Sequence, residues 1–148
     1  MEVQSMLIYV DGSWFKDQCK ARWSFAVFKN NKPVHVESGG IYGRLLSNVD
    51  GELEAAKRAV EYALKRRAKL LVLCYDYAGI EEFALGRWKP RNETAMRYVE
   101  TVRRARNAGL EIVFKKVDKR DRRNLLVDAL ARNDVRRAKQ LFRLVSRA

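Results

Sequence analysis

The sequence predicts an α/β fold built on a mixed five-stranded sheet, in which three antiparallel strands precede two parallel strands, with helices on both faces. Two observations support this prediction. Three short segments of strand character come first and are separated by turn residues. Segments with helical periodicity then alternate with two further strand-like segments. Strands that are reached through helices are expected to run parallel by right-handed crossovers.

The first three strands are predicted from apolar or alternating runs bounded by turn residues. The first run is followed by Asp11-Gly12-Ser13, which we interpret as a turn. The third run is followed by Gly39-Gly40, which is expected to end that strand. The three strands are expected at residues 7–10, 23–28 and 34–38.

The second half of the chain is predicted to alternate between helices and strands. In the first predicted helix, Leu53, Ala56 and Val60 lie on one face, and Asp50 or Gly51 can cap its start. A continuous apolar run then indicates a strand covered on both faces. Helices are expected at 51–66, 79–86, 93–107 and 121–132, with an extension over 134–146, and strands at 70–74 and 111–117. No linker or repeat divides the chain, so a single domain over residues 1–148 is expected.

Charge is the most unusual feature of the composition. The 148 residues include 31 Lys and Arg against 18 Asp and Glu, which gives a net charge of +13. This excess favours a polyanionic partner, and nucleic acid fits it better than an anionic membrane. The apolar runs exclude a disordered chain, and none is long enough to span a membrane. Two cysteines, with no secretory signal in view, suggest reduced thiols and a cytoplasmic location. A monomer without an organic cofactor is expected.

Four acidic residues on four separate elements can meet in space. Asp11 and Asp76 each follow an apolar strand, and parallel neighbouring strands would place both at the carboxyl edge of the sheet. Glu52 lies in the first turn of a helix, and Asp128 lies in the last core helix. Clustered carboxylates are unfavourable without a cation, and hard oxygen ligands suit Mg²⁺ or Mn²⁺. Two such ions can support phosphodiester hydrolysis.

Each of these acids also has a purely structural interpretation. Asp76 can cap the following helix, and Asp11 can be a turn residue. Glu52 can interact with the helix dipole. Asp128 can form an ion pair with Arg132 at i+4. The metal-site hypothesis therefore depends on the set rather than on any one residue.

Several motifs in order resemble the ribonuclease H family. The resemblance covers roughly residues 7–132 and is carried by four segments, each of which contains one of the acids, at 8–13, 48–56, 74–77 and 124–132. Two further segments, 79–89 and 114–117, resemble more particularly the bacterial and viroplasmin-associated branch of type 1 ribonucleases H.

The resemblance implies cleavage of the RNA strand in RNA–DNA hybrids, leaving a 5′-phosphate and a 3′-hydroxyl, with two Mg²⁺ or Mn²⁺ ions. Asp11 would bridge both ions, and Asp128 would help hold the ion that activates water. Glu52 and Asp76 would help hold the ion near the leaving oxygen. The residues expected to contact the substrate are Gly12, Ser13, Asn48, Lys89 and Asn124.

Two departures from the family pattern affect these expectations. Many members carry a histidine before the closing helix, whereas this chain has Asp118 there, and Asp118 or Lys119 can substitute for it. The single histidine, His35, is expected to be structural or exposed. The basic tail at about 133–148 can bind substrate or pack through its apolar stripe. Trp14 follows the first acidic motif and can approach the substrate.

Two other functions remain open on the same fold. The missing histidine is consistent with a module that binds RNA–DNA hybrid or double-stranded RNA with reduced or lost catalysis. An enzyme that cuts DNA, as resolvases and integrases do, is a third candidate. A binding module gains nothing from clustered acids that face phosphates, which favours the nuclease.

Overall fold

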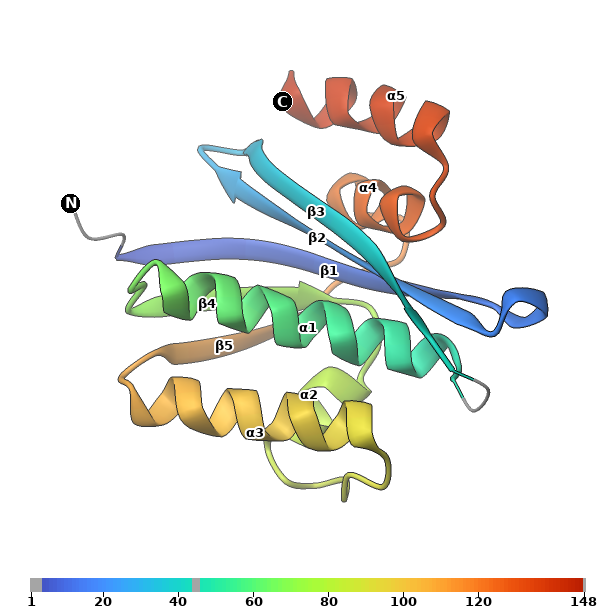
Figure 1. Cartoon of the computed structure of the whole chain (residues 1–148). Helices are drawn as coiled ribbons and strands as arrows, with labels where there is room; N and C mark the ends of the chain where they lie inside the picture. Colours follow the sequence, from blue (N-terminus) through green and yellow to red (C-terminus); the bar gives the residue numbers. More distant parts are fainter. Residues whose placement is uncertain (1–3, 44–45, 148) are drawn as a thin grey trace.

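The structure is a computed structural model that describes residues 4–43 and 46–147. Its strands form one sheet in the order β3-β2-β1-β4-β5 (Figure 1). The β1–β2 and β2–β3 pairs are antiparallel, whereas β4 runs parallel to both β1 and β5. The predicted mixed sheet is therefore confirmed. Its strands are β1 Ser5–Phe15, β2 Lys20–Lys29, β3 Lys32–Tyr42, β4 Leu70–Tyr75 and β5 Glu111–Lys116.

Helices cover both faces of the sheet, as predicted (Figure 1). Ile8 and Val10 of β1 pack in the core on the α1 and α3 side, whereas Tyr9 packs on the α4 and α5 side. This alternation gives the molecule two apolar cores, one on each face. No helix in the described ranges combines the length and the apolar character that a membrane crossing requires. The helices are α1 Asn48–Lys65, α2 Gly79–Ala84, α3 Glu93–Asn107, α4 Arg122–Ala131 and α5 Val135–Ser146, with a 3₁₀ turn at Lys16–Gln18.

Two predicted strand ends are wrong. β1 does not turn at Asp11-Gly12-Ser13 but continues to Phe15, because this segment pairs with β2, with Asp11 opposite Ser24. β3 likewise continues through Gly39-Gly40 to Tyr42. The ring of Trp23 lies over Gly39, where an added Cβ would be 2.7 Å from Cζ2 of the indole. These glycines make room for a neighbouring side chain rather than ending the strand.

The start of α1 also differs from the prediction. The helix begins at Asn48 with Ser47 as its N-cap, three residues before the expected start. Asp50 contributes from inside the first turn, where its carboxylate accepts a hydrogen bond of 2.8 Å from the Ser47 backbone N–H. The same carboxylate accepts one of 3.1 Å from the Asn92 side chain at the start of α3. Asp50 therefore joins the starts of two helices.

The basic C-terminal segment forms α5 and packs on the body of the protein. Ala138, Leu141 and Val145 are buried in the same core as Leu126 and Phe28. This confirms that the apolar stripe of the tail covers a surface.

β1 and α1 touch through two glycines. A Cβ on Gly12 would lie 2.1 Å from the Glu52 backbone nitrogen, and one on Gly51 would lie 3.0 Å from the Ser13 carbonyl oxygen of β1 and 2.4 Å from the Arg22 carbonyl oxygen of β2. Two backbones can approach this closely only where the residue at the contact is glycine, which has no side chain. This contact places the residues beside the two glycines, Asp11 and Glu52, next to each other.

We predict that Gly51→Ala destabilises the fold by about 1–3 kcal/mol or more, because the new methyl group meets backbone atoms that cannot move away. Gly40→Ala is the matched control, since its Cβ would meet chiefly the flexible Lys20 side chain, and we expect it to change stability by at most about 0.5 kcal/mol. Urea denaturation of both variants measures the difference. Equal stabilities would contradict the proposed tight contact.

Candidate metal and nucleic-acid site

Three of the four predicted acids lie close together at the carboxyl end of strand β4. Asp11 lies within β1, Asp76 directly follows the neighbouring strand β4, and Glu52 lies in the first turns of α1. Each offers a carboxylate oxygen, and these oxygens all lie within 4.8 Å of one another. Asp11 is 3% exposed and Glu52 is 6% exposed. The expectation that residues far apart in the sequence converge is therefore met for these three.

Asp128 lies in the same cleft but outside this group of three. Its carboxylate forms an ion pair with Arg132, with Nε 3.0 Å from Oδ1. The interpretation that Asp128 pairs with the residue one helical turn later is thus met. Its charge nevertheless contributes to raising the pKa of Asp11. Asp128 therefore contributes to the electrostatics of the site, and its carboxylate is paired with Arg132.

The surroundings of Asp11 and Glu52 disfavour the ionised form of both carboxyl groups. Burial, with a smaller contribution from the charge on Asp76, raises the pKa of Asp11 from 3.8 to about 7. Burial and the adjacent Asp11 likewise raise the pKa of Glu52 well above its usual value. One oxygen of Glu52, Oε2, is buried without a hydrogen-bond partner among the described residues. A buried carboxylate oxygen without a partner is costly, and a bound cation would supply the missing partner.

The donor set fits a hard divalent cation. All three groups are carboxylates, which bind Mg²⁺ and Mn²⁺ in preference to softer metals. The buried oxygen of Glu52 provides a ligand atom that forms no hydrogen bond within the described residues. The residues present therefore match the metal type that the sequence suggested.

The side chain of Asn124 holds the carboxylate of Asp76 in position. Its side chain is 1% exposed, and its Nδ2 donates a 3.1 Å hydrogen bond to Oδ2 of Asp76 and a weaker one of 3.4 Å to the Lys119 carbonyl. Asn124 therefore orients the carboxylate of Asp76, and its expected contact with substrate stays a prediction. The available sequence signal that Asn124 belongs to the acidic site was its position four residues before Asp128, on the same helix face.

Hydrogen bonds from three side chains hold the C-terminal part of α4 in place. The sequence did not predict the roles of Arg22 and Ser24, and it predicted a different role for Ser13. Nε of Arg22 donates to the Ala131 carbonyl at 3.0 Å, which puts a buried cation at the negative end of the helix. Ser24 Oγ donates to the Val127 carbonyl, one residue before Asp128, at 2.5 Å. Ser13 Oγ also donates to Ala131, at 2.6 Å, so this predicted substrate contact has a structural role.

The acids lie in a cleft of about 620 Å³ with a basic rim. Lys119, Arg120 and Arg132 line it, together with Trp14, which is 42% exposed. Of the predicted substrate contacts, those in the cleft are Gly12, Ser13, Asn48 and Asn124.

Lys89 is the exception among the predicted contacts. It does not line the acidic cleft and lies instead in a separate groove with Trp88 and Arg91. The loop between α2 and α3 carries it, and the structure does not group Lys89 with the acids.

The loop that lacks the family histidine contributes lysine rather than aspartate to the cleft. Asp118 is bound to Arg120 through the backbone N–H at 2.7 Å and through Nε at 3.2 Å. Lys119 lines the cleft, whereas Asp118 does not. His35 lies on β3, 2.8 Å from Glu37 and stacked on Tyr62, which agrees with its expected structural role.

We predict that Asp11→Asn stabilises the metal-free protein at pH 8. Because the Asp11 pKa of about 7 in the folded state exceeds its ordinary value of 3.8, native stability falls as pH rises between these values. In EDTA, the variant should be more stable at pH 8 by on the order of 1 kcal/mol, and the gain should shrink at pH 5, where Asp11 is protonated. Urea denaturation at both pH values tests this. A variant less stable than wild type at pH 8 would contradict it.

We also predict that Asn124→Ala weakens divalent-metal binding by about tenfold or more, because Asp76 loses the group that orients it. Asn107→Ala, at the exposed end of α3, is the matched control. Isothermal titration calorimetry with Mn²⁺ measures both affinities. Unchanged binding by the Asn124 variant would remove its positioning role.

Comparison with known proteins supports the fold. No family model matches the chain, and neither does any curated protein. Among solved structures, an N-terminal RNase H domain from Mycobacterium tuberculosis is similar, with a TM-score of 0.72, 20% identity and coverage of 93% of this chain and 97% of that chain.

Two further solved structures are similar at the same level. RNase H1 from the halophilic archaeon Halobacterium salinarum has a TM-score of 0.71 and 19% identity over 88% of this chain and 98% of its own. LC11-RNase H1, solved in complex with an RNA/DNA hybrid, has a TM-score of 0.70 and 19% identity over 86% and 94%. At these identities the likeness establishes architecture: the chain has the ribonuclease H fold.

Proposed function

We propose that this chain is a metal-dependent endoribonuclease of the ribonuclease H family that cleaves the RNA strand of RNA–DNA hybrids. The observation that carries the proposal is the group of three carboxylates within 4.8 Å, one with a buried oxygen that lacks a partner, inside a cleft with a basic rim. The similar LC11-RNase H1 was solved with an RNA/DNA hybrid, which supports this choice of substrate.

Asp11, Glu52 and Asp76 are the residues that would hold divalent cations, with Asp128 as the fourth ligand of a pair of Mg²⁺ or Mn²⁺ ions. When bound, such ions supply an activated water and neutralise charge on the leaving oxygen of a phosphodiester. Asp128 is paired with Arg132, whose side chain is 67% exposed. Arg132 can therefore exchange this carboxylate for a substrate phosphate.

The basic rim would hold the nucleic acid over the acids. Lys119, Arg120 and Arg132 supply charges for backbone phosphates, which dominate the affinity of such complexes. Asn48 and Gly12 line the same cleft, which supports the proposal that Asn48 and the Gly12 backbone contact the hybrid. Recognition of 2′-hydroxyls along that strand would distinguish a hybrid from a DNA duplex. Lys119 is our candidate for the role of the missing histidine.

A module that only binds nucleic acid explains the site less well. Its affinity would be lowered by buried acids that face phosphates, and it would not need a carboxylate oxygen without a partner. The monomeric state, the cytoplasmic location, the single-domain organisation and the bacterial branch stay predictions from the sequence.

We predict that the protein cleaves the labelled RNA strand of a hybrid when Mg²⁺ or Mn²⁺ is added, and that Asp11→Asn and Asp76→Asn each abolish cleavage. Asp17→Asn, on the exposed 3₁₀ turn outside the cleft, is the matched control and should retain activity. Gel analysis of the products at neutral and alkaline pH measures the rates. Absence of cleavage with both metals would refute the nuclease assignment.

The same assay separates the alternatives. Cleavage of a DNA duplex of the same sequence would indicate a DNA endonuclease, and binding of hybrid without turnover by the wild-type protein would indicate a binding module. The Asp11→Asn variant should still bind hybrid, because its basic rim is intact.

A further inference from the structure

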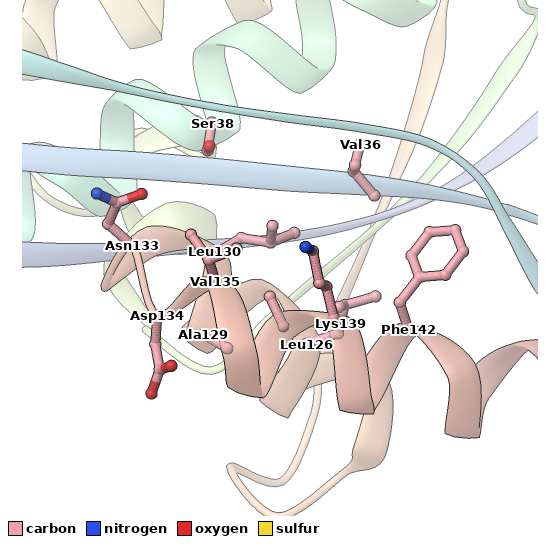
Figure 2. Close-up of a pocket in the computed structure, with 11 residues that line it drawn as sticks. Val36, Ser38, Leu126, Ala129, Leu130, Asn133, Asp134, Val135, Lys139 and Phe142 are labelled. Atoms are coloured by element: carbon pink, nitrogen blue, oxygen red, sulfur yellow. The ribbon is translucent and has the colours of Figure 1, made fainter.

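A second concave site lies on the far side of α4, away from the acids. It is an apolar pocket of about 270 Å³ enclosed by α4, α5 and the edge strand β3 (Figure 2). Val36 of β3, Leu126 and Leu130 of α4, and Val135 and Phe142 of α5 supply its apolar walls. None of these residues lines the acidic cleft.

The apolar surface continues out of this pocket onto the exterior. Val135 is 57% exposed and Phe142 is 39% exposed, although α5 buries other apolar residues against the core. Val34, on the same strand as Val36, is 58% exposed. Exposed apolar side chains of α5 therefore adjoin this pocket, and exposed apolar patches on soluble proteins commonly mark binding sites.

A row of cations runs along the same helix. Arg136, Lys139 and Arg143 are spaced at i, i+3 and i+7 and are all exposed. Within the described part of the chain, none of them has a carboxylate within the 4.0 Å of an ion pair, and α5 itself contains no acidic residue. On α3, by contrast, Arg97 and Arg103 pair with glutamates of their own helix.

The nearest acid does not neutralise this row. Asp134 caps α5, where its carboxylate accepts a hydrogen bond from the Arg137 backbone N–H at 3.1 Å. Asp134 is among the residues that line the pocket, but in Figure 2 its carboxylate points away from β3, whereas the Lys139 ammonium lies between α5 and β3. The pocket thus combines apolar walls with the Lys139 ammonium, which forms no ion pair among the described residues.

We propose that this groove binds an acidic peptide segment of a partner protein, with one bulky apolar side chain in the pocket and flanking carboxylates on Lys139, Arg136 and Arg143. A pocket of about 270 Å³ is smaller than the usual site for a drug-sized ligand, about 300–1,000 Å³, but can take a single large side chain. Apolar anchors in pockets, surrounded by charge pairs, are typical of peptide recognition.

Nucleic acid fits the groove less well than such a peptide. Phosphates would use the cations of α5 but would gain nothing from the apolar walls. The acidic peptide uses both features, and this complementarity decides between the two polyanions.

The test uses the whole chain and a fluorescein-labelled peptide, Glu-Asp-Glu-Trp-Leu-Asp-Glu-Asp, followed by fluorescence anisotropy. We expect saturable binding that weakens with salt, and binding weaker by about fivefold or more when serine replaces both Trp and Leu. If the serine peptide binds as tightly as the Trp-Leu peptide, the apolar pocket is not used and the proposal is overturned. Absence of saturable binding overturns it as well.

Variants locate the binding. Lys139→Glu and Phe142→Ser should each weaken binding of the Trp-Leu peptide by about fivefold or more. Lys69→Glu makes the same change in net charge at an exposed position before β4, outside the groove, and should leave the affinity nearly unchanged. Circular dichroism checks that each variant is folded. Equal losses in Lys69→Glu and Lys139→Glu would show non-specific attraction and refute the groove.

Discussion

The contact between the backbones of β1 and α1 is the constraint on which the site depends. Gly12 and Gly51 have no side chains, so the strand and the helix approach until an added Cβ would overlap backbone atoms. The residues beside these glycines, Asp11 and Glu52, are thereby forced together and buried. The parallel pairing of β4 with β1 then brings in Asp76. A structural requirement at two glycines thus positions the chemistry of the cleft.

The fold accommodates these clustered acids because hydrogen bonds elsewhere hold the surrounding helices in place. The buried guanidinium of Arg22 holds the C-terminal carbonyls of α4, and Asp50 joins the starts of α1 and α3. The acids themselves remain poorly compensated, as the raised pKa of Asp11 and the orphaned oxygen of Glu52 indicate. Sites that are electrostatically unfavourable when empty are expected where function, rather than stability, determines the residues.

Periodicity and strand order were sufficient to predict the mixed sheet and the convergence of Asp11 with Asp76, because β1 and β4 are parallel neighbours with Tyr9 opposite Cys74, two residues before each acid. Local signals failed where tertiary pairing outweighed them. Asp-Gly-Ser has turn propensity, yet this segment remains in β1 because β2 pairs with it. The roles of Asn124 and Arg22 depend on contacts over 48 and 109 residues of sequence, which no local pattern reveals. The position of Lys89 in a groove separate from the acids was likewise not predictable from a local pattern.

The central claim is that the three converging carboxylates bind a divalent cation. Anomalous diffraction from crystals soaked in Mn²⁺ tests it most directly. We expect a peak about 2.0–2.3 Å from carboxylate oxygens of Asp11, Glu52 and Asp76. A cleft that stays empty at saturating Mn²⁺, with Glu52 Oε2 still without a partner, would contradict the account.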